Sequence, residues 1–423
     1  MAMSRRLLSS LHVVALVRHC AHSLSSGRPS IDAAPFGEHR GVPVTKWTLR
    51  GGGGALEVAV ISYGATLVSA RSADRAGAVD ELTLNYPTLA PIVAPGFPYL
   101  GSTVGRVANR VSNARFELDG VAHALAANHF SSCLHGGPDG WGRRPWVLRD
   151  ARADASGAAL TLALRSADGD GGFPGAVEAE ATFAVAGPEL TLAWRATCDA
   201  PTPVAMTNHA YWNLAGASAR RGAAEHSLHV DARARLEVDC EAVPTGAVLP
   251  VAGTPYDLRW PEGAQSALAA PKLGPRMLAA DSGVARDGTP RAGFDHCFVL
   301  DPAAPERRAP ARRASKPLRR AARLLDARSG RSMTVWTTQP ALQVYTANFL
   351  PVSPAAADDD EPAAPSPVAR HNAVCLETQH HVDAVNQRAR HPELFPDTVL
   401  RPGEVYEEET VHVFEALGRD EGG

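Results

Sequence analysis

A glutamate stands directly behind an apolar run in the segment AVCLETQHHVDAVN, residues 373–386. A carboxylate placed among apolar residues is costly to remove from water unless the protein uses it. Glutamate and histidine side chains are the usual general acids and bases of enzymes. Glu377 is therefore a candidate for proton transfer, although one glutamate taken alone could equally lie on a solvated strand face.

Five further stretches place polar groups where a plain structural protein would not need them. Each has an ordinary explanation, because a histidine near a turn is usually a satisfied structural residue and an asparagine there is often a cap. The residues are Arg106, Asn109 and Arg110 in GRVANR, His135 in LHGG, Asn208 and His209 in TNHAYWNL, Asp295 and His296 in GFDH, and Gln343 in LQVY.

As a set these residues are harder to dismiss. They combine neutral hydrogen-bonding groups, arginine, imidazole and carboxylate, and the aromatic residues Tyr211, Trp212 and Tyr345 are close by in the sequence. This mixture suits a sugar, because hydroxyl groups accept and donate several hydrogen bonds while the C–H faces pack on rings. No cofactor motif and no G-x-S-x-G nucleophile motif is present. Acid–base chemistry by histidine and glutamate is the remaining candidate.

Short strands separated by turns must position these groups. From about Val42 onward, segments such as ALTLALRS (159–166) and ELTLAWRATCD (189–199) alternate apolar and polar residues. Strict alternation indicates half-buried strands. The 37 glycines and 33 prolines recur between them, and no long amphipathic helix pattern appears. The sequence predicts an all-β fold, a large antiparallel β-sandwich.

Three segments break this pattern. Residues 1–35 hold no acidic residue before Asp32 and are rich in serine and arginine, so we treat them as an N-terminal extension outside the fold. This extension could be a transit peptide, an uncleaved extension or a signal peptide. A transit peptide predicts an organellar location and an uncleaved extension a cytoplasmic one. Residues 302–330 and 351–370 are predicted to be loop insertions, rich in alanine, arginine and proline or in acidic residues and proline. We expect residues 36–418 to form one domain.

The composition limits the kinds of molecule that this protein is expected to bind. A formal net charge of −3 and a pI near 6.6 give no case for nucleic acid or an anionic membrane, and fit a small neutral ligand. The basic segment 302–330 lacks the interleaved aromatics of a nucleic-acid site. Six cysteines at long spacings, without a C-x-x-C motif, favour reduced thiols and give no zinc pattern. We expect a small-molecule partner, no nucleic acid, no membrane, and no metal or cofactor.

Eight polar motifs occur in an order that resembles the aldose 1-epimerase (galactose mutarotase) family: GRVANR, LHGG, TNHAYWNLAG, YDLR, GFDH, TTQPALQVYTANF, CLETQHHVDAVN and LRPGEVYEEET. The resemblance implies one large β-sandwich of the galactose mutarotase type, acting as a cofactor-independent monomer. It also implies that Glu377 is the base and His209 the acid in opening and closing the ring of a free aldohexose such as glucose or galactose. The implied substrate contacts are Asn109, Arg110, His135, Asp295 and Gln343.

The proposed chemistry sets a condition on charge. Glu377 must be ionised while His209 is protonated, so we expect a carboxylate such as Asp295 to favour charged His209. Hydrogen bonds from glutamine or arginine donors would keep Glu377 ionised. Ala341 and Ala347 stand where glycine is usual in the family, and a positive φ at either would strain the backbone by about 1 kcal/mol.

Two alternatives stay open at this point. A hexose 6-phosphate mutarotase of similar fold would need an anionic subsite, for which Arg106, Arg143 and Arg144 could supply charge. A non-catalytic sugar-binding protein would be expected to lack the glutamate or the histidine, and both Glu377 and His209 are present. The preferred aldose is decided by loops around the cleft, which the motifs do not specify.

Overall fold

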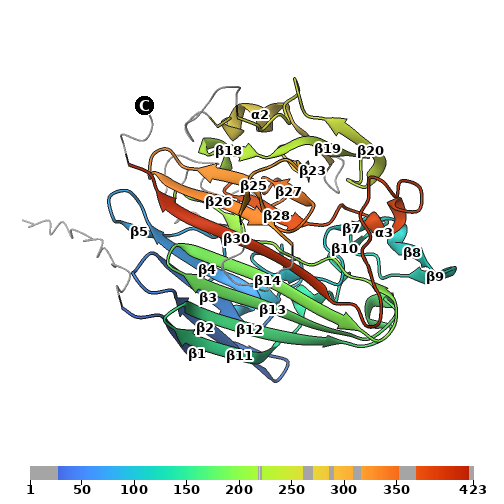
Figure 1. Ribbon diagram of the computed structural model, residues 1–423, viewed down its shortest axis with the longest axis horizontal. Helices are drawn as coiled ribbons and strands as arrows, with labels where there is room; N and C mark the ends of the chain where they lie inside the picture. Colours follow the sequence, from blue (N-terminus) through green and yellow to red (C-terminus); the bar gives the residue numbers. More distant parts are fainter. Residues whose placement is uncertain are drawn as a thin grey trace, which may run out of the picture.

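The protein is a two-layer antiparallel β-sandwich (Figure 1), which confirms the predicted fold class. Cα register pairs are antiparallel in every ladder of its three large sheets. None of the helices found in the described residues is long and apolar enough to cross a membrane. The computed structural model describes residues 27–217, 219, 222–260, 270–284, 290–307, 316–351 and 368–418.

One layer is a nine-stranded sheet that runs the length of the molecule. It joins hairpins from the middle of the chain to the C-terminal strand β30, which lies at its centre. In spatial order its strands are β11 (Val147–Asp154), β12 (Gly157–Ser166), β13 (Val177–Ala186), β14 (Glu189–Cys198), β30 (Tyr406–Ala416), β26 (Arg331–Thr337), β25 (Leu318–Leu325) and β18 (Ser227–Val230), with β24 (Glu306–Arg307) paired to β25.

The opposite layer is made of two sheets joined edge to edge through a bridge between Thr83 and Trp212. The five-stranded sheet contains β1 (Ser30–His39), β2 (Val42–Arg50), β3 (Leu56–Ile61), β4 (Thr66–Ala73) and β5 (Val79–Glu81). The six-stranded sheet has the order β17 (Tyr211–Trp212), β28 (Val374–Gln379), β27 (Ala341–Tyr345), β23 (Asp295–Leu300), β19 (Ala232–Val238) and β20 (Pro244–Pro250).

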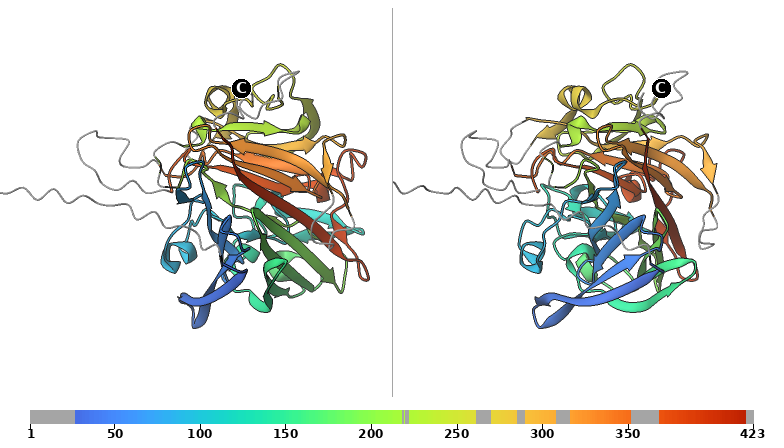
Figure 2. Two further views of the ribbon diagram at one scale, coloured as in Figure 1. Left: turned by 60° about the vertical axis from the view of Figure 1, so that its left-hand side comes forward. Right: turned by 90° about the vertical axis from the view of Figure 1, so that its left-hand side faces the viewer.

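A continuous hydrophobic core fills the space between the layers. Alternate residues of β12, such as Leu160 and Leu162, pack in the same cluster as Val58 and Val60 of β3. Figure 2 shows the blue N-terminal strands facing the green strands of the nine-stranded sheet. The period-two pattern thus sends one face of each strand into the core and leaves the other face for solvent or a ligand.

Short elements close the ends of the sandwich. The helices are α1 (Leu89–Val93), α2 (Leu273–Ala279), α3 (Ala384–Gln387) and the 3-10 turns η1 (Ser112–Ala114), η2 (Trp141–Arg143), η3 (Asp170–Gly172) and η4 (Ala223–Glu225). The two-stranded ribbons pair β6 (Thr103–Val104) with β16 (Thr207–Asn208), β7 (Arg110–Val111) with β10 (Cys133–Leu134), β8 (Arg115–Leu118) with β9 (Val121–Ala124), β15 (Thr202–Pro203) with β29 (Val399–Leu400), and β21 (Asp281–Val284) with β22 (Pro290–Ala292).

Two of the predicted boundaries are wrong. Strand β1 begins at Ser30, inside the segment 1–35 that we excluded from the fold; it is an exposed edge strand without apolar alternation, held by pairing with β2. Strand β25 lies inside the predicted loop 302–330. Its leucines and alanines are buried, and Arg320 pairs with Asp231, so the arginine-rich composition concealed a strand. Residues 1–26, 308–315 and 352–367 lie outside the described residues.

Candidate active site

The face of the six-stranded sheet that points away from the sandwich core carries three of the predicted site residues. In β27 and β28, Val344 and Leu376 belong to the core cluster, while Gln343 and Glu377 face the other way. Gln343 and Glu377 lie directly opposite each other in the antiparallel register. Asp295, the first residue of β23, contacts Gln343 from the next strand. The alternation of three strands therefore gathers polar groups on one surface.

Loops from the first half of the chain build the wall of a cleft of about 550 Å³ over this surface. Asn109 and His135 lock two of these loops together: the N–H of His135 donates to the carbonyl of Asn109 (2.8 Å), and the N–H of Asn109 donates to Nδ1 of His135 (3.1 Å). Both residues have a positive φ, 61° and 53°. Such strained backbone conformations cluster at functional sites, where surrounding contacts hold them.

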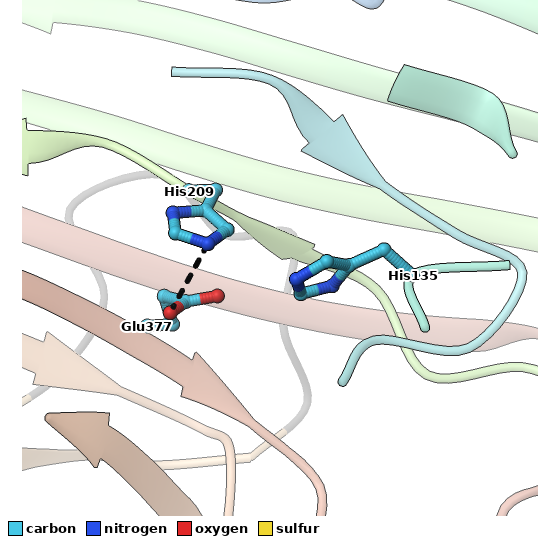
Figure 3. Close-up of side chains that lie close together, drawn as sticks. All are labelled: His135, His209 and Glu377. Carbon is cyan, nitrogen blue, oxygen red and sulfur yellow. Dashed lines mark ion pairs between the residues drawn. The ribbon is translucent and has the colours of Figure 1, made fainter. Parts of the chain in front are cut away.

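His209 and Glu377 face each other at the bottom of the cleft. Nε2 of His209 is 3.7 Å from Oε1 of Glu377, and His135 points toward the same space (Figure 3). His209 follows directly after β16, and its ring lies parallel to that of Tyr211 with centroids 5.0 Å apart. Glu377 is only 3% exposed. The acid and base predicted from distant motifs therefore share one pocket.

A chain of hydrogen bonds holds the predicted substrate-contact residues beside this pair. The Arg110 guanidinium donates to Oδ1 of Asn109 (3.0 Å) and lies 3.4 Å from Oδ2 of Asp295. Gln343 donates from Nε2 to Oδ1 of Asp295 (2.6 Å). All of these groups are buried or nearly so, and they present amide, guanidinium and carboxylate atoms to a small volume. This is the donor and acceptor set that a polyhydroxylated ligand requires.

Burial shifts the pKa values of Glu377 and His209 in opposite directions. Desolvation raises the pKa of Glu377 well above its usual range; the negative charge of Asp295 raises it further, and Arg110 only partly opposes the rise. Desolvation also lowers the pKa of His209 to about 4. Desolvation therefore favours the uncharged form of both side chains, the carboxylic acid of Glu377 and the neutral imidazole of His209.

This result corrects our expectation about the charge on the pair. We expected Asp295 to favour a charged His209, but Asp295 acts on Glu377 and raises its pKa instead. We also expected donors to keep Glu377 ionised, yet Oε2 of Glu377 has no hydrogen-bond partner in the described part of the protein. Burial thus favours the pair in which Glu377 carries the proton and His209 is neutral.

The two histidines and Glu377 have the donor types of a metal site, with atoms within 4.8 Å of one another. The hydrogen bond from the Asn109 N–H to Nδ1 of His135 argues against that use, because it leaves the proton of a neutral imidazole on Nε2. Desolvation, with help from His209 and Arg110, lowers the pKa of His135 well below its usual value, so its imidazole is neutral. His135 is therefore placed to donate a hydrogen bond into the cleft.

The structure separates the candidate residues into three groups. Glu377, His209, Asn109, Arg110, His135 and Asp295 line the cleft, whereas Gln343 sits behind Asp295 and holds it. Three other candidates are structural: the Asn208 amide donates to the Gly101 carbonyl, the His296 ring accepts from the Asp295 N–H, and the Arg106 guanidinium is enclosed.

Sequence analysis missed several residues of the cleft wall. Tyr99 lies 4.8 Å from the His135 ring, and the Arg143 guanidinium stacks over Tyr99 at 4.7 Å. Asn128 and Phe349 also line the cleft. Tyr99 and Asn128 lie in loops outside the quoted motifs, whereas Phe349 ends the TTQPALQVYTANF motif and Arg143 was expected only as a possible charge for a phosphate subsite.

The comparisons with known proteins agree with this geometry. The model of the aldose 1-epimerase family matches residues 45–412. The human galactose mutarotase is 35% identical over 383 residues, which cover 90% of this chain and 97% of that protein. The aldose 1-epimerase of Escherichia coli K12 is 33% identical over 376 residues, 88% of this chain and 96% of that one. The chain belongs to the aldose 1-epimerase family.

Solved structures show the same fold. A GalM/aldose epimerase homologue from C. elegans superimposes with a TM-score of 0.68 at 28% identity and covers 86% of this chain and 97% of its own. A galactose 1-epimerase from Lactobacillus acidophilus gives a TM-score of 0.71 at 22% identity, over 92% of this chain and 99% of its own. The galactose mutarotase type of sandwich, predicted from the motifs, is thereby confirmed.

Proposed function

We propose that this protein is an aldose 1-epimerase, an isomerase that interconverts the α and β anomers of free aldohexoses such as galactose and glucose. The observation that carries the proposal is the pair of His209 and Glu377, 3.7 Å apart at the bottom of a cleft large enough for one pyranose. Relatives named galactose mutarotase and aldose 1-epimerase, which match nearly the whole chain, support it.

The reaction needs one acid and one base. Glu377 takes the proton of the C1 hydroxyl while protonated His209 gives a proton to the ring oxygen. The C1–O5 bond then breaks, its electron pair goes to O5, and a C1 aldehyde forms. After rotation about C1–C2, the same steps in reverse close the ring on the other face of C1. Each group typically contributes about 10²–10⁴-fold to the rate.

The cycle needs no proton from outside the pair, because one proton moves between the two groups and the sugar. An ionised Glu377 with a charged His209 holds the same number of protons as the neutral pair that burial favours, so the two forms interconvert by moving one proton within the pair. Ring opening turns the charged pair into the neutral pair, which is the form needed for closure. Arg110, Asp295 and the Nε2–H of His135 bind and orient the sugar hydroxyls while the proton moves.

The arrangement of the arginines favours a free sugar over a sugar phosphate in this cleft. The Arg106 guanidinium is bound by Ser166, Thr202 and carbonyl groups. Arg144 pairs with Asp170 at 2.6 Å, and neither it nor Arg106 lines the cleft. Arg143 does line it, but a single partly engaged arginine is a poor subsite for a dianion.

We also propose that the protein acts as a monomer. One chain already supplies the proposed acid, the proposed base and the hydrogen-bonding groups around them. A molar mass near 44.5 kDa from light scattering supports this proposal. A stable dimer contradicts it.

Polarimetry on freshly dissolved α-galactose and α-glucose tests the activity. We expect the purified protein to speed the approach to the equilibrium rotation over the spontaneous rate, with no added metal or cofactor. Glucose 6-phosphate serves as a competitor: weak or no inhibition of sugar turnover is expected, and tight competition would favour the sugar-phosphate alternative. Binding of galactose without any acceleration would leave a non-catalytic sugar-binding protein.

A further inference from the structure

Four arginines that the mechanism does not require gather around a second cavity of about 430 Å³. We call it the arginine pocket, after Arg40, Arg106, Arg143 and Arg144. Its acidic lining residues are Asp139 and Asp170, so arginine outnumbers carboxylate two to one in a chain whose overall formal charge is −3. The pocket shares Arg143 with the sugar cleft, but Glu377 and His209 do not line it.

Two of these arginines serve the fold. Nη1 and Nη2 of Arg106 donate to the Pro174 carbonyl (2.8 Å) and the Ala167 carbonyl (2.7 Å), and hydroxyl groups take the remaining donors. Arg144 forms its ion pair with Asp170. The pair is close to neutral, so the excess positive charge of the pocket comes from buried Arg106 and from the other two arginines.

Arg40 and Arg143 have donors to offer. Arg40 lies at the turn between β1 and β2 with an exposed side chain, and no carboxylate of the described chain lies within 4 Å of it. Arg143 uses Nε and Nη2 to hold the Tyr99 hydroxyl (3.4 Å) and the Phe97 carbonyl (3.0 Å). Both guanidinium groups lie close enough to Tyr63 to influence its hydroxyl. Burial raises the pKa of Tyr63, the positive charges of Arg40 and Arg143 oppose this rise, and the negative charge of Asp139 adds to it.

We propose that the arginine pocket binds a phosphate group, either inorganic phosphate or the phosphate of a small monoester, beside the sugar cleft and independently of it. A phosphate dianion matches an excess of two arginines, and planar guanidinium groups bind its oxygens with paired hydrogen bonds. The cavity has room for the organic part of a monoester as well. The proposal rests on charge and geometry and does not depend on the mutarotase activity.

Isothermal titration calorimetry on the full chain tests the site, with inorganic phosphate and glucose 6-phosphate as probes. We expect phosphate to bind even when galactose is saturating, since Glu377 and His209 line the sugar cleft and do not line the arginine pocket. Arg40→Gln should weaken it about tenfold, which is the loss expected for one charge-assisted contact. Arg165→Gln is the matched control, because Arg165 is also exposed, lies on β12 and pairs with Glu178 alone among the described residues. The phosphate affinity of this variant should equal that of the unchanged protein.

Each outcome of the titrations either supports or overturns the proposed phosphate site. Binding of both probes with similar affinity identifies the phosphate group itself as the ligand, and at least tenfold tighter binding of glucose 6-phosphate identifies a monoester; both support the pocket. No binding, an equal loss in Arg165→Gln, or displacement of phosphate by galactose overturns the proposal. Polarimetry on Arg40→Gln should give the unchanged mutarotation rate, so a failed pocket and a failed mutarotase are distinguishable.

Discussion

Two glutamates of this protein are equally buried, but their pKa values are shifted in opposite directions. Glu377 on β28 and Glu408 on β30 are each 3% exposed. Glu408 is surrounded by donors: Lys316 (2.6 Å), His380 (3.5 Å) and the Thr338 hydroxyl. Although burial alone would raise the pKa of Glu408, these hydrogen bonds and charges outweigh it and the pKa is lowered. In Glu377 burial wins, helped by Asp295, and the pKa is raised.

The difference shows what distinguishes Glu377, the proposed base, from a structural carboxylate. Burial alone does not, because both residues share it. Glu377 keeps an oxygen without a protein partner and lies at the bottom of a cleft, so a ligand hydroxyl can supply the missing hydrogen bond. The backbone differs as well: the cleft region contains positive φ values at Tyr99, Asn109 and His135, whereas none occurs among the residues that surround Glu408. Strain and unsatisfied polar groups occur together at the site.

The largest expected effect separates the two glutamates by activity. Glu377→Gln removes the proposed base and should lower kcat/KM for galactose mutarotation by about 10²–10⁴-fold while sugar binding largely survives. Glu408→Gln is the matched control, with the same chemistry at a site of equal burial, and should keep a rate close to that of the unchanged protein. Polarimetry and calorimetry with galactose measure the two quantities. A near-normal rate in Glu377→Gln would refute the role of this residue.

The pH dependence of the rate comes next in size. The His209–Glu377 pair works only while it holds one proton. Below pH about 4, the pKa of His209, the pair gains a second proton and loses its base, so kcat/KM should fall about tenfold per pH unit. At high pH the rate should fall only above the raised pKa of Glu377. Polarimetric rates corrected for spontaneous mutarotation give the profile, and an acid limb near pH 6.5 would contradict a buried neutral His209.

Stability should respond in opposite directions to the same two substitutions. Glu408 has a lowered folded-state pKa, so its stabilisation is present above the unfolded value, near 4.5, and is lost as pH falls. Glu408→Gln should cost about 1–3 kcal/mol in free energy of unfolding at pH 7. Glu377 has a raised pKa and destabilises the fold as pH rises above its unfolded value, so Glu377→Gln should stabilise the protein at pH 7.

Urea denaturation at pH 7 and pH 4 measures both differences. Each should shrink at pH 4, because the glutamates are then closer to the same protonation in the folded and unfolded chains. If both variants change the free energy of unfolding in the same direction at pH 7, then the fold stabilises the ionised form of Glu377 as it does that of Glu408.

The smallest expected effect concerns the strained backbone of the cleft. Of the two alanines that stand at positions where the family usually has glycine, Ala347 has a φ of 55° and Ala341 lies in strand β27 without a positive φ. Both are fully buried. Ala341→Gly should therefore be more destabilising than Ala347→Gly by about 1 kcal/mol, because only the second relieves a left-handed alanine. Equal midpoints in urea would show that the cleft stores no such strain at Ala347.

Much of the fold and of the site can be predicted from the sequence. Alternating strands such as 159–166 specify a β-sandwich, since period two and burial of one face are local properties of the chain. The motifs also identify the residue types of the cleft. Strands without that signal escape prediction: β1 is an exposed edge and β25 is rich in arginine, and both exist because a neighbouring strand pairs with them.

The sequence by itself determined that Glu377 follows an apolar strand and that histidines are available to it. Residue type and spacing did not determine which histidine is its partner, and His209 was implied only by the family resemblance. His380, three residues away in the same motif, faces a different pocket and pairs with Glu408, whereas His209 from a distant loop faces Glu377. Only the tertiary structure decides this, because side chains alternate across a sheet and the long-range packing of loops selects which groups share one desolvated volume.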